Sequence, residues 1–176
     1  MYYVEKDNKI ALFNSDREVL ENTIRFSADY KDAVIQETEE GYTIVDFKLI
    51  TIEEYNVQQL EKAKQTKIQE NDTVRDTALN AGVVYKDVLF DSDTDQKVNL
   101  LATIGFMSDE DTVNWFGKDN QMLVCNKEDL LNIGNMIIQL HSYCWTKNAE
   151  IKFAISNAKT MEELNSIEID YTIEEV

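Results

Sequence analysis

Short apolar runs alternate with polar turns over the first fifty residues, a pattern that predicts strands joined by turns, with one short helix. Residues 2–6 and 10–13 are apolar runs on either side of a polar turn, so we expect a β-hairpin. Ser15 and Glu18 have the spacing of a capping box, which predicts that a helix begins there. Residues 1–50 are therefore expected to form a small β-α-β unit.

A second hairpin is expected to complete this unit. Residues 33–38 and 42–50 are both apolar enough to be strands, and Gly41 lies in the polar turn between them. The alternation in the second segment is imperfect but typical of a strand.

A long polar segment then predicts one continuous helix. Residues 52–80 contain no glycine or proline and are rich in helix-forming residues. Thr51 and Glu54 form another capping box, and Gly82 suits the position just after a helix end. We therefore expect a helical connector over residues 51–81.

The apolar stripe on this helix is thin, which limits what the helix can do. Leu60, Ile68 and Val74 are among its few apolar positions, and so narrow a stripe cannot anchor a helix deep in a core. The segment is expected to be either an exposed connector or a self-association surface. Leu60, Ile68 and Val74 are accordingly the candidate partner-binding residues.

The remaining chain has the pattern of one α+β module, residues 82–176, which we expect to fold on its own. The expected elements are a strand over 83–90, a helix ending near 107, a hairpin of 112–116 with 121–125, a long helix capped by Asn126, and a short helix opened by Thr160 and Glu163. The predicted fold class is thus α+β, with a small N-terminal β-hairpin/helix unit, a long connecting helix, and a C-terminal β-hairpin packed on a long helix.

The charge balance narrows the classes of partner. The chain has 34 acidic and 17 basic residues, a formal net charge of −17. Such a surface repels nucleic-acid phosphates and anionic membranes, so neither is an expected partner. No apolar run approaches the length of a membrane span, and the first residues lack the pattern of a signal peptide. We therefore expect the protein to be made and folded in a cytosol.

Candidate chemistry is sparse. His141 is the only histidine, and we expect it to have a structural role beside Cys144, which we expect to be buried. A zinc site formed by these two residues would need two more ligands, and Cys125 is the only soft candidate. Asp91, Asp93 and Asp95 resemble the start of a calcium loop, but the later positions of that pattern do not match. Helix capping explains these acids better, although calcium binding stays open.

The sequence offers no other cofactor or catalytic site. The five glycines are isolated, so no phosphate-binding loop is expected, and no cofactor or metal is assigned. Trp115, Phe116 and Trp145 could form a ligand shelf, but core packing is favoured. We expect no enzymatic activity.

One group of residues carries a family resemblance across about half of the chain. They are residues 85–91, 112–115, Asp119, Asn120, Leu123, Asp129, Leu130, His141, Cys144, Trp145, Ile151, Ile155, Ala158 and 160–167. In order and spacing this segment resembles a domain-of-unknown-function family of tailed bacteriophages and prophages, often encoded beside tail-fibre genes. The family has no known catalytic residues, so the resemblance implies none here.

Three functions compete at this level. The first is a non-enzymatic interaction protein of the phage tail region, either a tail-fibre or baseplate component or a fibre-assembly chaperone, with a phage tail or fibre protein as partner and a homo-oligomer as a further expectation. The second is an acidic DNA mimic that inhibits a host nucleic-acid enzyme, which the net charge alone supports. The third is a small enzyme, for which one histidine and no glycine loop leave little support.

Overall fold

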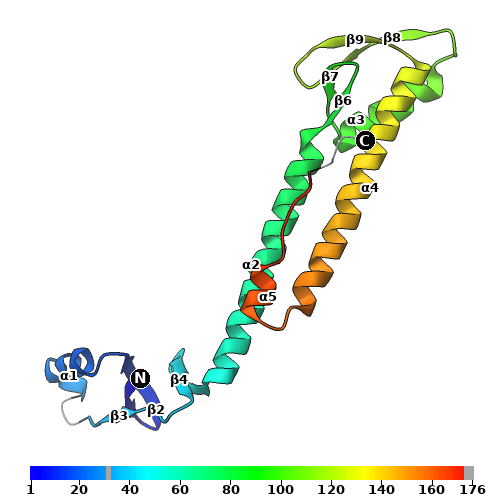
Figure 1. Ribbon diagram of the computed structural model, residues 1–176. Coiled ribbons are helices and arrows are strands. Elements are labelled where there is room, and N and C mark those ends of the chain that lie inside the picture. Colours follow the sequence, from blue (N-terminus) through cyan, green and yellow to red (C-terminus); the bar gives the residue numbers. More distant parts are fainter. Residues whose placement is uncertain (31–32, 173–176) are drawn as a thin grey trace. The chain divides into compact units, whose positions relative to one another are not determined.

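The computed structural model describes residues 1–30 and 33–172 and has a mixed α+β architecture of helices and small antiparallel sheets (Figure 1). The chain divides into two compact units, Met1–Ala63 and Lys64–Val176. A long helix and a C-terminal hairpin that contacts another long helix are both present, so the predicted fold class is confirmed.

The first unit is built on a three-stranded antiparallel sheet. Its strands are β1 (Tyr2–Lys6), β2 (Lys9–Asn14) and β3 (Ile35–Glu37), in the order β2-β1-β3. Helix α1 (Arg17–Arg25) is followed by the short 3-10 helix η1 (Ala28–Tyr30). Val4 of β1 packs with Leu20 and Ile24 of α1 to form a small core.

The N-cap of α1 is one residue later than predicted. Asp16, not Ser15, caps the helix, and its carboxylate accepts a hydrogen bond of 2.9 Å from the Glu18 backbone N–H. A carboxylate is favoured at this place because it also interacts well with the positive end of the helix dipole.

The predicted second hairpin is wrong in its pairing. Strand β3 pairs with β1, with Ile35 opposite Val4, while β4 (Tyr42–Val45) pairs with β5 (Lys48–Thr51). Asp46 and Phe47 both have positive φ, 48° and 61°, as a tight two-residue hairpin turn requires. The chain therefore turns within the segment that the sequence assigned to a single strand.

Helix α2 (Ile52–Ala81) has nearly the bounds that the sequence predicts. The capping box is present: Thr51 Oγ1 accepts from the Glu54 N–H at 3.1 Å, and Glu54 Oε2 accepts from the Thr51 N–H at 3.0 Å. The helix ends before Gly82, whose φ is +88°. A Cβ there would collide with the Phe90 backbone, so the position requires glycine on two grounds.

The second unit contains two hairpins and three further helices. Its elements are β6 (Val83–Tyr85), β7 (Val88–Phe90), α3 (Thr94–Phe106), β8 (Thr112–Phe116), β9 (Met122–Asn126), α4 (Lys127–Asn157) and α5 (Met161–Asn165). The single strand predicted over 83–90 is wrong, because Lys86 and Asp87 adopt positive φ and make a turn between β6 and β7. The predicted caps Asn126 and Thr160 are confirmed.

Helix α4 carries the core of the second unit. Its buried apolar side chains recur at helical spacing: Leu130, Ile133, Ile137, Leu140, Cys144, Ile151 and Ile155. After α5 the chain runs back along α2 (Figure 1), and Tyr171 is buried there. None of the helices within the described ranges combines the length and apolar character needed to cross a bilayer.

Candidate functional site

Helix α4 meets α2 through polar side chains, which we call the polar seam: Asn71, Asp72, Asn148, Lys152 and Tyr171. Asn71 is fully buried, donates to the Asn148 carbonyl oxygen at 3.4 Å and accepts from the Tyr171 hydroxyl at 2.8 Å. Asp72 accepts from Asn148 Nδ2 at 3.0 Å and from Lys152 Nζ at 2.9 Å. The hydrogen bond from Lys152 holds the pKa of Asp72 below its usual value. These contacts fix how α2 and α4 are aligned within the second unit.

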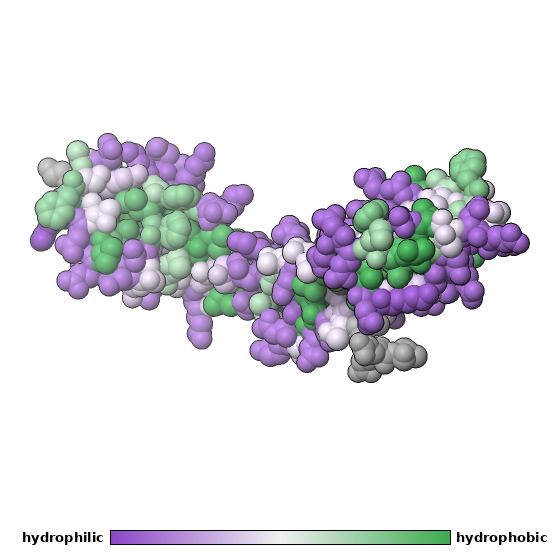
Figure 2. All heavy atoms as spheres, turned by 90° about the horizontal axis from the view of Figure 1, so that it is seen from above, coloured by the Kyte–Doolittle hydropathy of each residue, from purple (hydrophilic) through white to green (hydrophobic). Residues whose placement is uncertain are grey.

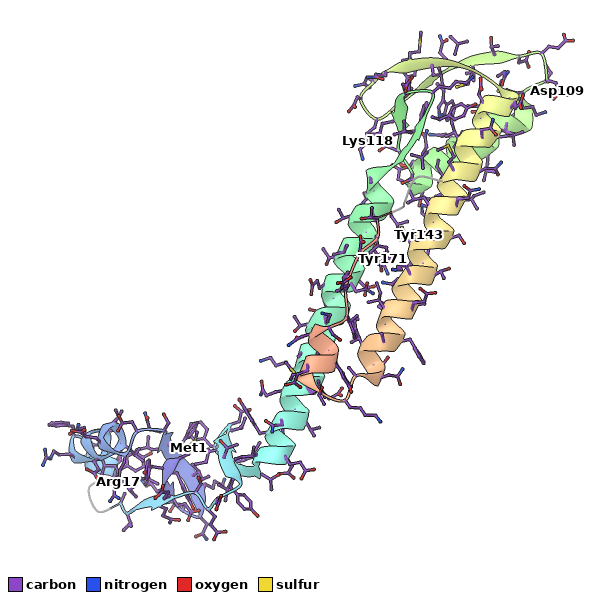
Figure 3. All side chains as sticks on the ribbon, viewed as in Figure 1. Met1, Arg17, Asp109, Lys118, Tyr143 and Tyr171 are labelled. Atoms are coloured by element: carbon purple, nitrogen blue, oxygen red, sulfur yellow. The ribbon has the colours of Figure 1, made fainter. Side chains whose placement is uncertain are left out.

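Residues 171 and 172 make further contacts beside this seam. Figure 3 shows Tyr171 beside α2 and Tyr143 on α4, and the Tyr143 hydroxyl donates to the Thr172 carbonyl oxygen at 3.1 Å. Burial raises the pKa of Tyr171. The buried hydroxyl is therefore a structural donor at neutral pH.

The three aromatic residues that the sequence grouped do not share one environment. Trp115 points inward from β8 and is half-buried, whereas Phe116 is 58% exposed and Trp145 is 55% exposed. The Arg75 guanidinium lies over the Trp145 ring, 4.5 Å from its centroid. The preference for core packing is therefore wrong for Phe116 and Trp145.

Asp129, at the start of α4, is a second polar centre. It completes the capping box with Asn126 and accepts hydrogen bonds from the Tyr85 hydroxyl at 2.8 Å and from Lys86 Nζ at 2.7 Å. The bond from Lys86 is the main reason that the pKa of Asp129 is lowered. This arrangement ties the β6–β7 hairpin to α4, and the Tyr85 hydroxyl also accepts a hydrogen bond from Asn132 Nδ2 at 3.3 Å.

His141 lies at the edge of the core, as the sequence predicts. Its Nε2 is 2.9 Å from the Ser92 carbonyl oxygen, and the Ser92 hydroxyl itself bonds to the Leu79 carbonyl oxygen. An open polar pocket of about 300 Å³ adjoins it and is lined partly by Asp76, Asp93 and Lys97. The Nε2 of His141 is therefore engaged by a backbone carbonyl oxygen of the protein itself.

The acids of the calcium-like pattern make separate local contacts. Asp91 pairs with Lys118 at 3.5 Å, Asp93 caps α3 by accepting from the Gln96 N–H at 2.7 Å, and Asp95 lies in the first turn of α3. Across residues 1–30 and 33–172, no three His, Cys, Asp or Glu side chains are grouped as metal ligands would be.

Both cysteines are free and buried. Burial raises the pKa of Cys125 and of Cys144, so neither is activated as a nucleophile. The predicted burial of Cys144 is confirmed.

The side of α4 that faces α3 has a different character. An apolar groove of about 180 Å³ runs between the two helices; it is lined by Lys97, Leu100, Leu101, Ile104, Leu131, Gly134, Asn135 and Ile138, and we call it the α3–α4 groove. Leu101 is 72% exposed and Ile138 is 64% exposed. Only Lys97 among the lining residues is charged.

The stretches that supply this groove are free of charged residues. Residues 98–107 and 130–145 contain no Asp, Glu, Lys or Arg, in a chain that is 29% charged. This is a signal that the sequence analysis could have used, because exposed helix faces normally carry charges. Figure 2 shows hydrophobic residues, in green, exposed on the surface among hydrophilic ones, in purple.

A second exposed apolar surface lies on the outer face of the β8–β9 hairpin. Phe116 is paired with Met122 across the two strands, and Val124 follows two residues later on the same face. Each of these three side chains is more than half exposed. We call this surface the hairpin face.

The predicted partner-binding residues on α2 are all half-buried. Leu60 belongs to the first unit, whereas Ile68 and Val74 belong to the second. In the second unit the neighbouring α2 residues Asn71 and Asp72 already bind α4. Partner binding by Leu60, Ile68 and Val74 stays a prediction.

Comparison with known proteins identifies one family. No curated protein and no solved structure matches the chain. The model of a family described as "Domain of unknown function (DUF4376)" matches residues 62–173, which include the later part of α2 and nearly all of the second unit. The sequence resemblance also pointed to a domain of unknown function, and the match agrees with it on that point. The matched region begins earlier in the chain than the resemblance did, within α2. The chain therefore belongs to the DUF4376 family.

Proposed function

We propose that the chain is a non-enzymatic interaction protein of the bacteriophage tail region, either a component associated with the tail fibre or baseplate or a chaperone for fibre assembly. The observation that carries the proposal is the amount of large apolar side chain left exposed in the second unit. The α3–α4 groove and the hairpin face both expose such side chains, for example Leu101, Ile138 and Met122.

Exposed apolar patches need a physical reason. A monomeric soluble protein rarely exposes contiguous apolar patches of more than about a few hundred Å², and larger patches commonly mark contact sites for other proteins. The polar groups of the polar seam and around Asp129, by contrast, are bonded to the protein itself, as Asp72 and Asp129 illustrate. Among the described residues, Gln96 Nε2 and Trp115 Nε1 are the buried side-chain polar atoms that have no partner. Binding through apolar surface therefore accounts for this unit better than chemistry at a polar site.

The tail region as the place of action rests on the resemblance carried by residues 85–171. The acidic surface is compatible with that place, since a contact between tail proteins requires no nucleic acid. The expected locations are the bacterial host cytoplasm during assembly and, for a virion component, the tail itself.

Affinity capture of the tagged full chain from phage-producing cells tests the proposal. We expect a tail or fibre protein to be recovered, and Met122→Asp on the hairpin face to reduce that recovery at least about tenfold, as loss of a central apolar contact does. Val57→Asp, at an equally exposed position on α2, is the matched control and should change nothing. Recovery of no tail protein by the wild type would contradict the proposal.

Mass spectrometry of purified particles then separates the two forms of the proposal. A virion component should be present in stoichiometric amounts, and a chaperone should be absent. The alternative function, a DNA mimic, rests on net charge alone; it predicts that the pure protein inhibits a host nuclease or polymerase in a salt-dependent manner.

A further inference from the structure

We infer that the α3–α4 groove is the contact surface for a second copy of this chain, with two α4 helices crossing antiparallel at Gly134 and Asn135. The inference rests on the proposed function and adds to it, because it names a second copy of the chain as the partner of one exposed apolar surface, the α3–α4 groove. It is carried by the charge distribution, by the symmetry of the residues on α4, and by the glycine at the centre of the groove.

The charge distribution of the second unit limits which kind of partner can bind the α3–α4 groove. The second unit has 20 acidic and 10 basic residues, so two copies repel each other over most of their surfaces. A basic partner would be recognised through acidic residues, yet the groove is lined by none, and its one charged residue is Lys97. Because the cores of protein interfaces are depleted of charge, a face that carries no acidic residue is where two acidic copies can meet.

The apolar residues of α4 in the groove are arranged symmetrically along the helix. Leu131 and Ile138 lie at equal distances in sequence on either side of the Gly134–Asn135 pair. In an antiparallel crossing centred on that pair, Leu131 of each copy faces Ile138 of the other. A twofold interface requires a self-complementary surface of this kind.

Among the described residues, no packing contact accounts for the glycine at position 134. It lies inside a 31-residue helix, where glycine costs about 0.5–1 kcal/mol relative to alanine. A Cβ at this position would have no neighbouring atom within 4 Å, so the protein's own packing does not require glycine. A second helix backbone approaching closely at this point would require it.

Substitutions in and outside the groove provide the matched variants. Ile138→Asp and Leu101→Asp place a charge in the groove at well-exposed positions. Gly134→Leu keeps the surface apolar but fills the crossing point, so its effect cannot be attributed to added charge. Phe153→Asp is the control, because Phe153 is 73% exposed on the same helix and does not line the groove.

Sedimentation velocity of the full chain at micromolar concentration tests the inference, with circular dichroism confirming that each variant is folded. We expect a wild-type dimer, a dissociation constant raised more than about tenfold by each groove variant, and no change for Phe153→Asp. A wild-type monomer would overturn the inference even if the chain still captures a tail protein. A dimer that depends on the groove supports it even if no tail protein is captured, in which case only the proposed function fails.

Discussion

The two sides of helix α4 differ in how they are covered. Against α2 the helix presents Asn148 and Lys152, whose polar groups are bonded to α2 residues. Beside α3 it presents Leu131 and Ile138, which are 46% and 64% exposed. The polar residues are covered by the protein's own chain, whereas these two apolar residues of the α3–α4 groove are left exposed.

The different coverage of the two sides of α4 indicates that they have different roles. Buried polar groups that all have partners favour a single alignment of the packed elements, because any shift would leave them without hydrogen bonds. An open apolar face adds nothing to the stability of the monomer until another molecule covers it. We therefore assign α2–α4 packing to folding and the α3–α4 groove to association.

The largest expected effect comes from removing α2. A fragment of residues 64–176 should give a cooperative thermal transition, because it retains the whole second unit. The sequence pattern alone predicts that residues 82–176 fold independently. This fragment lacks Asn71, Asp72 and Arg75, so from the structure we expect the opposite result, no cooperative transition. Circular dichroism melts of the two fragments measure this, and equal transitions would show that the polar seam is dispensable.

A smaller loss of stability is expected when one residue of the polar seam is replaced. Asn71→Ala leaves the buried Tyr171 hydroxyl without its acceptor and should lower the free energy of unfolding by roughly 1–3 kcal/mol. Gln69→Ala, at an exposed position on the same helix, should change it by no more than about 0.5 kcal/mol. Urea denaturation of the two variants measures these changes. Similar losses of unfolding free energy in both would contradict a specific role for Asn71.

The smallest expected effect is a loss of folding stability at acid pH. Asp72 and Asp129 have lowered pKa values in the folded protein, so each stabilises the fold above its unfolded pKa of about 3.9. That contribution is lost as the pH falls through the lower folded values. Denaturation between neutral pH and pH values below about 4 should therefore show a falling stability. The double variant Asp72→Asn with Asp129→Asn should be less stable at neutral pH and show a shallower fall; an unchanged slope would contradict this.

Elements with local signals could be predicted from the sequence. The caps at Asn126 and Thr160 and the bounds of α2 followed from capping residues and from the absence of glycine and proline. The turns at Asp46–Phe47 and Lys86–Asp87 could not, because non-glycine residues with positive φ have no strong sequence signature. Strand pairing also failed, since β3 joins β1 across more than thirty residues.

The sequence pattern predicts the interaction surface on α2, and it does not predict the α3–α4 groove or the hairpin face. The thin stripe of Leu60, Ile68 and Val74 suggested an uncovered helix, whereas polar contacts from Asn71 and Asp72 hold α2 to α4 in the second unit. Hydrophobic periodicity does not register such contacts, because it counts only apolar side chains. The charge-free stretches 98–107 and 130–145 held the more useful signal.

Cross-linking at the proposed crossing point tests the central claim most directly. Asn135→Cys in the full chain should give a covalent dimer with a short bismaleimide, because residue 135 of each copy lies beside the proposed twofold axis. Phe153→Cys should not, and neither should the wild type, whose Cys125 and Cys144 are buried. Efficient cross-linking of Asn135→Cys alone is the predicted result. Cross-linking no greater than that of Phe153→Cys would contradict the assignment of the α3–α4 groove to a second copy.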